Sequence, residues 1–262
     1  MKTISSRQNP LIKDLHLLAT SASERRQQAK TVLDGVHLVQ AAMAHGVSLD
    51  LVCVSERGYQ SAEIAALIDV IEPLTSCLYL PDALFHHISP TDTPAGILAV
   101  IKQPTEMTAK TSTSSCVVLE GIQDVGNLGT IFRTAAAAGI ESVFLSEGCA
   151  QAWSPRVLRA AMGAHFLLSI HEKVNIAELL TGYQGVSVAT ALDGACNLYE
   201  MNLHQPIAWL FGSEGQGLSV GTMALAQQKV MIPMAKGVES LNVAAAAAVC
   251  LFEERRQKLA VS

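Results

Sequence analysis

The fold class is decided by residues 116–148, which read CVVLEGIQDVGNLGTIFRTAAAAGIESVFLSEG. Apolar residues over 116–122 and 142–148 predict two buried strands, and the small and apolar residues of 127–138 predict a helix between them. Strands joined through a helix are typical of a parallel sheet that helices cover on both faces. The stretch therefore predicts an α/β domain with a parallel sheet.

The same alternation continues to the C-terminus. Further strands are expected at 165–170, 186–192, 207–213 and 229–234. Further helices are expected at 155–162, 176–181, 221–228 and 242–258. Ligands of such sheets bind in the loops that follow the carboxyl ends of the strands. The polar residues of those loops are therefore the candidates for a functional site.

A smaller α/β domain is expected before this one. Residues 10–18 repeat apolar side chains at helical spacing, and 50–55 and 97–101 have the pattern of short buried strands. A polar segment rich in Thr and Ser then predicts a linker. The chain is thus expected to divide into an N-terminal domain, a linker and a C-terminal domain, at residues 1–103, 104–115 and 116–262.

The composition indicates a cytoplasmic protein. Its longest apolar run, 243–252, is about half of the roughly 20 residues that a membrane helix needs. The charged N-terminus lacks the apolar core of a signal peptide, so export is not expected. None of the six cysteines lies within four residues of another, which predicts reduced thiols and no zinc site. His86 and His87 stand without a carboxylate-rich loop nearby, so no metal is expected.

Charge is distributed unevenly along the chain. The net charge is −5, yet the first 30 residues hold six basic and two acidic side chains. Local clustering matters more for nucleic-acid binding than the sum over the chain. This basic segment is either a solvated helix face or a nucleic-acid surface.

Three polar stretches follow predicted strands. In the first, Asp124 or Asn127 could cap the coming helix, and Arg133 stands among small and apolar residues. Such an arginine either pairs with a core carboxylate or reaches over the helix start to a phosphate. The second, WLFGSEGQGLS at 209–219, has three glycines in the spacing GxxGxG, which is not a dinucleotide fingerprint. Its glycines give a tight turn or close approach to a ligand, and Glu214 is a surface acid or a site carboxylate.

The third polar stretch is the loop before the last helix. It carries Glu239, Ser240 and Asn242. Ser240 is expected to cap the helix, with Asn242 in its first turn. Capping explains one of the three polar residues and leaves the cluster unexplained.

In order and spacing, these three stretches resemble the three motifs of the SpoU/TrmH family of the SPOUT class, over nearly all of 116–256. NPLIKDLHLL at 9–18 and LDGVHLVQAA at 33–42 resemble the L30e-like substrate-binding domain of that family. The resemblance implies a deep trefoil knot in the C-terminal domain and a homodimer. It also implies S-adenosylmethionine as cofactor and methylation of a ribose 2′-hydroxyl in structured RNA, ribosomal before transfer RNA.

The resemblance carries roles onto matching positions. Catalytic roles fall on Asn127, Arg133, Glu214, Ser240 and Asn242. Cofactor binding falls on Gly212, Ile232, Leu241, Met234, Thr190, Ala191 and Leu192. Two positions depart from the family pattern: Pro is common where Val125 or Gly126 stands, and Ser where Ala244 stands.

Free arginine has a pKa above about 12 and is a poor base, so Arg133 is expected to hold the phosphate beside the target ribose and to stabilise charge. Asn127 and Glu214 are expected to orient it. Two alternatives remain open. A catalytically silent RNA-binding module on the same fold predicts loss of Arg133 or Asn127, and both are present. An unrelated nucleotide-dependent enzyme predicts a GxGxxG after an early strand, and the chain has none.

Overall fold

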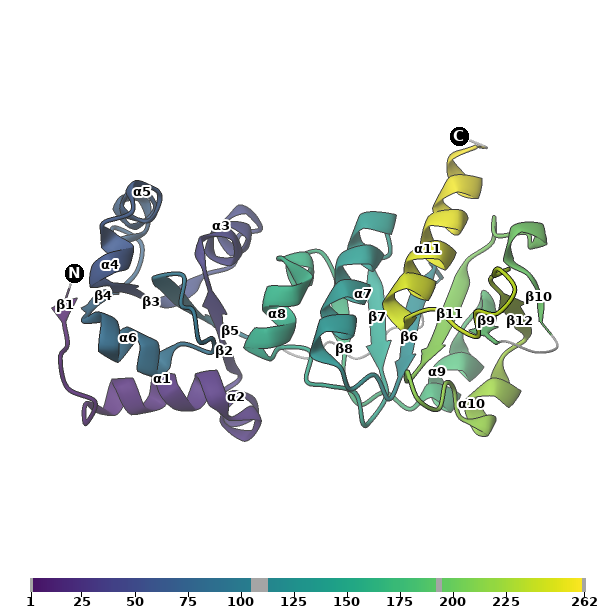
Figure 1. Ribbon diagram of the computed structural model, residues 1–262, viewed down its shortest axis with the longest axis horizontal. Coiled ribbons are helices and arrows are strands. Elements are labelled where there is room, and N and C mark those ends of the chain that lie inside the picture. Colours follow the sequence, from purple (N-terminus) through teal and green to yellow (C-terminus); the bar gives the residue numbers. More distant parts are fainter. Residues whose placement is uncertain (1, 105–112, 192–194, 261–262) are drawn as a thin grey trace. The chain divides into compact units, whose positions relative to one another are not determined.

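The computed structural model describes residues 2–104, 113–191 and 195–260 (Figure 1). The chain divides into two compact units, Met1–Thr105 with Trp153–Phe166, and Glu106–Ala152 with Leu167–Ser262. The linker expected at 104–115 lies largely outside the described residues, so the domain limits stay predictions.

The described part of the first unit contains a five-stranded mixed sheet in the order β1-β4-β3-β5-β2. Its strands are β1 (Lys2–Thr3), β2 (Lys30–Asp34), β3 (Leu49–Ser55), β4 (Cys77–Leu80) and β5 (Ile97–Lys102). Its helices are α1 (Pro10–Thr20), α2 (Ala22–Gln28), α3 (Val36–Ala44), α4 (Glu56–Tyr59), α5 (Ala62–Ile71), α6 (Asp82–Ile88) and α8 (Pro155–Ala161), with the 3₁₀ turn η1 (Ala164–Phe166). The sheet confirms that the N-terminal part is an α/β domain.

Helix α1 forms where the sequence predicted it because three local signals agree. Asn9 accepts a hydrogen bond from the Leu11 amide at 3.0 Å, and Pro10 occupies the first helical position. Leu15 and Leu18 lie on the buried face and pack with α6 and the sheet.

Some basic side chains of the N-terminal segment have partners within the fold. Arg25 is 5% exposed and donates to the carbonyl oxygen of Leu18 at 2.9 Å, and Lys30 pairs with Asp50 at 2.9 Å. Arg7, Lys13 and Arg26 are exposed, as is Lys2. The positive charge that faces solvent is therefore smaller than the sequence count.

The described part of the second unit holds a seven-stranded, entirely parallel sheet in the order β10-β12-β9-β11-β6-β7-β8. Its strands are β6 (Cys116–Glu120), β7 (Ser142–Leu145), β8 (Ser169–His171), β9 (Val186–Thr190), β10 (Cys196–Asn197), β11 (Ile207–Gly212) and β12 (Gln228–Met231). Its helices are α7 (Val125–Ala138), α9 (Ile176–Gly182), α10 (Val220–Leu225) and α11 (Val243–Leu259), with the 3₁₀ turn η2 (Leu198–Glu200). The predicted parallel α/β sheet is confirmed.

Helices cover both faces of this sheet. Val118 and Leu210 point toward α9 and α10, where they join one apolar cluster. Trp209, the neighbour of Leu210 in β11, bonds to Glu254 of α11, which packs beside α7 on the other face (Figure 1). Successive residues of a strand point to opposite faces, so every central strand is apolar on both sides.

Two expected elements differ. The strand expected at 165–170 is wrong, because residues 164–166 form a 3₁₀ turn after the left-handed Gly163 (φ +88°) and only 169–171 join the sheet. The helix expected at 221–228 ends at Leu225, because residues from Gln228 onward pair with β9. The knot stays a prediction, since strand order does not define how the chain threads. Within the described ranges, no helix has the length and apolar character needed to cross a bilayer.

Candidate active site

The candidate residues gather at one edge of the parallel sheet. Strands β12, β9, β11 and β6 are neighbours, so their carboxyl ends meet at the same edge. Thr190 ends β9 and Gly212 ends β11, while Ile232 directly follows β12. The Ala191 amide donates to the carbonyl oxygen of Val230 at 2.9 Å, which ties two of these strand ends together. Leu192 lies outside the described residues.

Three side chains from the three polar stretches meet at this edge. The Asn127 amide nitrogen Nδ2 donates to Glu214 Oε1 at 2.6 Å, and Asn242 Nδ2 donates to Asn127 Oδ1 at 2.9 Å. These partners lie 87 and 115 residues apart in the sequence. We call Asn127, Glu214 and Asn242 the polar triad. Both ends of the Asn127 amide are used, so its orientation is defined by its partners.

Two members of the triad, Asn127 and Asn242, lie at the capped starts of α7 and α11. Asp124 accepts from the Asn127 backbone amide at 2.7 Å and caps α7 without the proline common in the family. Asn242 caps α11 by accepting from the Ala244 amide at 2.9 Å. The expectation that Ser240 caps this helix is wrong, because the helix begins at Val243 and the asparagine reaches its free amides first.

Arg133 stands apart from the triad. It is exposed on α7, six residues after Asn127, which corresponds to about 9 Å along a helix axis. The Arg133 side chain forms no hydrogen bond or ion pair with another of the described residues. The triad members therefore bond to one another and not to Arg133, and its guanidinium is available to a group outside this chain.

The segment between β12 and α11 exposes much of its surface. Ser240 and Leu241 are exposed, the latter by 40%, and Ile232 and Met234 are half-buried. Residues 232–242 form no regular helix or strand, so many of their backbone N–H and C=O groups lack the hydrogen bonds of a helix or a sheet. Such groups can bind a ligand that is held mainly by backbone contacts.

The glycine-bearing loop after β11 is tightly closed at its base. A Cβ atom on Gly212 would lie 2.0 Å from the carbonyl carbon of Gly217, so only glycine fits there. Ser213 and Gly217 form an isolated bridge, and Gly217 has a φ of +67°. The loop thus uses one glycine for close backbone approach and another for a turn.

Glu120 is a polar residue of this edge that sequence reasoning missed. Its carboxylate, at the end of β6, accepts from the Ser219 amide and Ser219 Oγ at 2.8 Å each and from Thr222 Oγ1 at 2.7 Å. It lines two cavities of about 380 and 760 Å³ at this edge. An acidic residue ending an apolar strand, directly before Gly121, was the available signal. Among the described residues, no group of three or more His, Cys, Asp or Glu side chains could hold a metal ion.

Comparisons with known proteins agree over the whole chain. The SpoU rRNA Methylase family matches residues 114–252, and the MRM3-like substrate binding domain matches residues 9–99. An uncharacterized tRNA/rRNA methyltransferase of Synechocystis is 36% identical over 99% of this chain and 96% of its own length. The 23S rRNA (guanosine(2553)-2′-O)-methyltransferase RlmP of Bacillus subtilis is 31% identical over 97% of this chain and all of its own. The AdoMet-bound rRNA methyltransferase of Sinorhizobium meliloti is 28% identical, with a TM-score of 0.82 over 97% of both chains.

Proposed function

The chain belongs to the SpoU rRNA Methylase family, and from this membership we propose that it methylates a ribose 2′-hydroxyl of ribosomal RNA with S-adenosylmethionine. The polar triad is the single observation that carries the proposal for the site, because it joins all three motif stretches at the edge where parallel sheets bind ligands.

The reaction makes one principal demand on the protein. S-adenosylmethionine, when bound, supplies a sulfonium methyl group and leaves as a neutral thioether, so the leaving group needs little help. The ribose hydroxyl is a poor nucleophile that must lose its proton as its oxygen forms the new C–O bond. The chain's own task is to align that oxygen and to stabilise the charge developing on it.

Arg133 suits the stabilising role because its exposed side chain has no partner among the described residues. Its planar guanidinium holds a phosphate with two parallel hydrogen bonds and lies beside the neighbouring 2′-oxygen, where its charge favours loss of the proton to water or phosphate. The polar triad holds the starts of α7 and α11 against the loop of Glu214. Ser240 and Asn242 line the ribose side of the pocket.

The residues at the strand ends suit this cofactor. Gly212 brings the β11 strand end against the next loop, and no atom lies within 4 Å of a Cβ built on Gly215 or Gly237. Backbone groups after β9, β11 and β12 would hold the nucleoside and amino acid parts, with Thr190, Ala191, Ile232, Met234 and Leu241 as the lining residues and Leu192 beyond the described part of the same loop.

The enzyme acts as a homodimer in this proposal. Phe252 is 47% exposed on α11, and α7 exposes Ala137 beside Arg133 on its solvent side. A second copy covering this surface would also bring its own groups toward Arg133. Sedimentation with parallel activity measurements over a dilution series tests this, and full activity of the monomer would contradict it.

The N-terminal unit contacts the RNA through one face of α1. Lys13, His16 and Leu17 share that face, and the His16 ring stacks on His87 at 4.3 Å with an angle of 6° between the planes. His16 Nδ1 lies 2.7 Å from the carbonyl oxygen of His87, so this nitrogen is the donor. Exposed Arg7 lies just before α1 and would bind phosphate together with Lys13.

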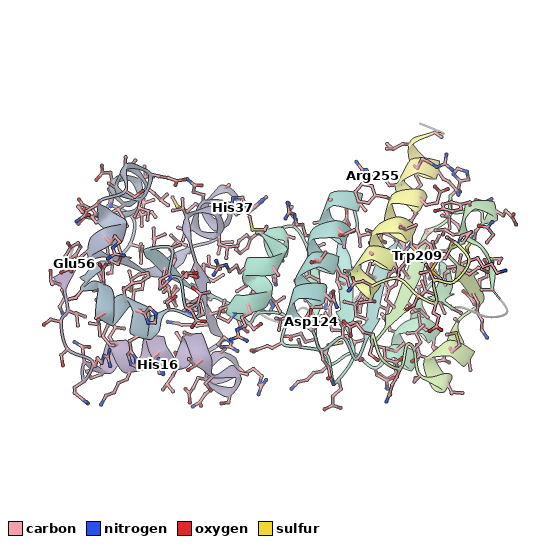
Figure 2. The ribbon with its side chains drawn as sticks, in the orientation of Figure 1. His16, His37, Glu56, Asp124, Trp209 and Arg255 are labelled. Carbon is pink, nitrogen blue, oxygen red and sulfur yellow. The ribbon has the colours of Figure 1, made fainter. Side chains whose placement is uncertain are left out.

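This surface is tested with R7S/K13S. The double variant should bind ribosomal RNA several-fold more weakly and show a smaller dependence of affinity on salt, because about two phosphate contacts are lost. R57S is the matched control, since Arg57 lies on α4. Figure 2 shows Glu56, the first residue of that helix, away from His16 on α1. Equal loss in both variants would contradict the assignment.

The function itself is tested with purified protein, ribosomal RNA and S-adenosylmethionine that carries a labelled methyl group. Label is expected at a 2′-oxygen, and a substrate with 2′-deoxyribose at that position should accept none. Transfer RNA serves as the competing substrate. Label on a base, or no binding of S-adenosylmethionine, would overturn the proposal, and the latter would favour a silent RNA-binding module.

We place this reaction in the cytoplasm. The described cysteines are all free, and Cys53, Cys77, Cys116 and Cys250 are buried, as expected of thiols in a reducing compartment.

A further inference from the structure

Glu120 accepts three hydrogen bonds at the carboxyl edge of the sheet. Its Oε1 accepts from two hydroxyls, those of Ser219 and Thr222, and its Oε2 accepts from the Ser219 backbone amide. Ser219 in turn caps α10 by accepting from the Thr222 amide at 3.1 Å. One side chain of β6 thereby holds the start of α10 at three points.

We propose that Glu120 is a positioning residue that fixes the loop carrying Gly212 and Glu214, a role that rests on the methyltransferase function proposed above. The loop runs from Gly212 to Ser219. Its far end is held by Glu120, and Glu214 is held by Asn127. Both holding residues belong to the same strand-turn-helix stretch, so that stretch sets where the loop lies.

A carboxylate is needed at this position because every partner donates. The three groups that converge on Glu120 are one backbone N–H and two hydroxyls. A carboxylate offers lone pairs on both oxygens, whereas an amide offers one oxygen and turns two hydrogens toward a donor. Glutamine would keep the size and lose the contact to the Ser219 amide.

The consequence reaches the cofactor edge through close packing. Gly212 lies so near the backbone of Gly217 and Leu218 that the loop base cannot shift without moving the end of β11. Release of Ser219 would therefore displace both the β11 strand end and Glu214. Glu120 thus acts on the site by holding the loop in place.

The test compares E120Q and E120D with E141Q as the matched control, since Glu141 is an exposed glutamate directly before β7, at the opposite edge of the sheet. E120Q is expected to weaken S-adenosylmethionine binding and to lower kcat, each by about tenfold, with KM for RNA unchanged. Hydrogen exchange of the amides in 213–219 should accelerate in E120Q. E120D keeps the charge and should recover part of the affinity, and E141Q should match the native protein.

A double-mutant cycle separates this role from general damage. If the carboxylate acts through Ser219, then E120Q with S219A should be little worse than either single change. Native affinity, kcat and exchange in E120Q would overturn the proposal, and so would equal effects in E141Q. An inactive native protein would instead overturn the methyltransferase function, while the exchange measurement would still report on the loop.

Discussion

The two ends of the parallel sheet each carry a glutamate in a polar network, and they differ in exposure. At the amino end, Glu254 is 3% exposed and accepts from Ser115 Oγ and from Trp209 Nε1. At the carboxyl end, Glu214 is exposed and accepts from Asn127. Figure 2 marks the two ends, with Asp124 where α7 begins and Arg255 on α11 toward the opposite end.

The difference in burial assigns stability to the network at the amino end and ligand binding to the network at the carboxyl end. A buried donor that loses its acceptor cannot turn to water, so breaking the amino-end network costs stability. Lys258 Nζ adds a bond of 2.6 Å to Glu254 and one of 2.9 Å to Ser115 Oγ, which joins the first strand of the sheet to the last helix. Glu214 at the carboxyl end is exposed and therefore remains available to a ligand.

The largest effect is expected from Arg133→Lys at the carboxyl end. Lysine keeps the charge but loses the planar guanidinium that binds phosphate at two points. We expect kcat to fall by about 10²–10³-fold, the usual loss for one donor aimed at developing charge. The free energy of unfolding should change by less than about 0.5 kcal/mol, because Arg133 is exposed.

Steady-state kinetics and chemical denaturation of the same preparation check this prediction. Arg156→Lys on α8 is the control, since Arg156 is also an exposed arginine on a helix. Near-normal turnover of the Arg133 variant would show that charge alone suffices and that the geometry of the guanidinium is irrelevant.

The next effect is at the amino end, where Glu254→Ala should reduce the free energy of unfolding by about 3 kcal/mol. It leaves the Trp209 N–H buried without its acceptor. Glu254→Gln retains an acceptor and should lose less. Glu214→Ala should have the opposite effect: activity should be lost, while the free energy of unfolding should stay within about 0.5 kcal/mol of the native value. If Glu214→Ala were the more destabilising of the two, the distinction between the ends would be wrong.

Local pattern was sufficient to predict most of the sheet. Apolar runs of 4–8 residues with helices between them predicted β6, β7, β9 and β11, because these strands are largely buried. The same pattern predicted β12, although only Val230 of that strand is buried. β10 was missed, since its two residues carry no periodicity. The strand expected at 165–170 failed because an apolar run does not reveal a turn set by the left-handed backbone of Met162 and Gly163.

The sequence predicted which residues belong to the site better than it predicted which of them contact one another. Resemblance named Asn127, Glu214 and Asn242, but their hydrogen bonds span about 90 to 115 residues and follow from the strand order, which no local pattern encodes. Glu120 was overlooked because its partners lie 99 and 102 residues away. Ser240 was assigned as a cap on local preference alone.

A smaller effect for each side chain should appear when the buried thiols near Glu254 are titrated. Burial, with Glu254 as the second cause, raises the pKa of Cys116 and of Cys250 to about 12, from 9.0. The folded state keeps these protons while the unfolded chain loses them. The stabilisation is therefore complete below pH 9 and declines as the pH rises toward 12, by about 1.4 kcal/mol per thiol and pH unit.

Denaturation curves between pH 8 and about 10.5 measure this decline. Cys116→Ala should make the decline shallower by about 1.4 kcal/mol per pH unit, because the substituted side chain no longer titrates while the buried thiols of Cys53 and Cys250 still do. Equal slopes in the native protein and the Cys116 variant would mean that this thiol is solvated in the folded state.

The smallest effect is the coupling between neighbours within each network. A double-mutant cycle on Asn127→Ala and Glu214→Ala, read as free energy of unfolding, should give about 0.5 kcal/mol, because water competes for exposed Glu214 and reaches half-buried Asn127. The cycle on Trp209→Phe and Glu254→Gln should give a larger coupling of about 1.5–3 kcal/mol, since that hydrogen bond to a charged group is buried. If the cycle at the carboxyl end were the larger, exposure would not explain the division, and the polar triad would be a structural clamp as much as part of the site.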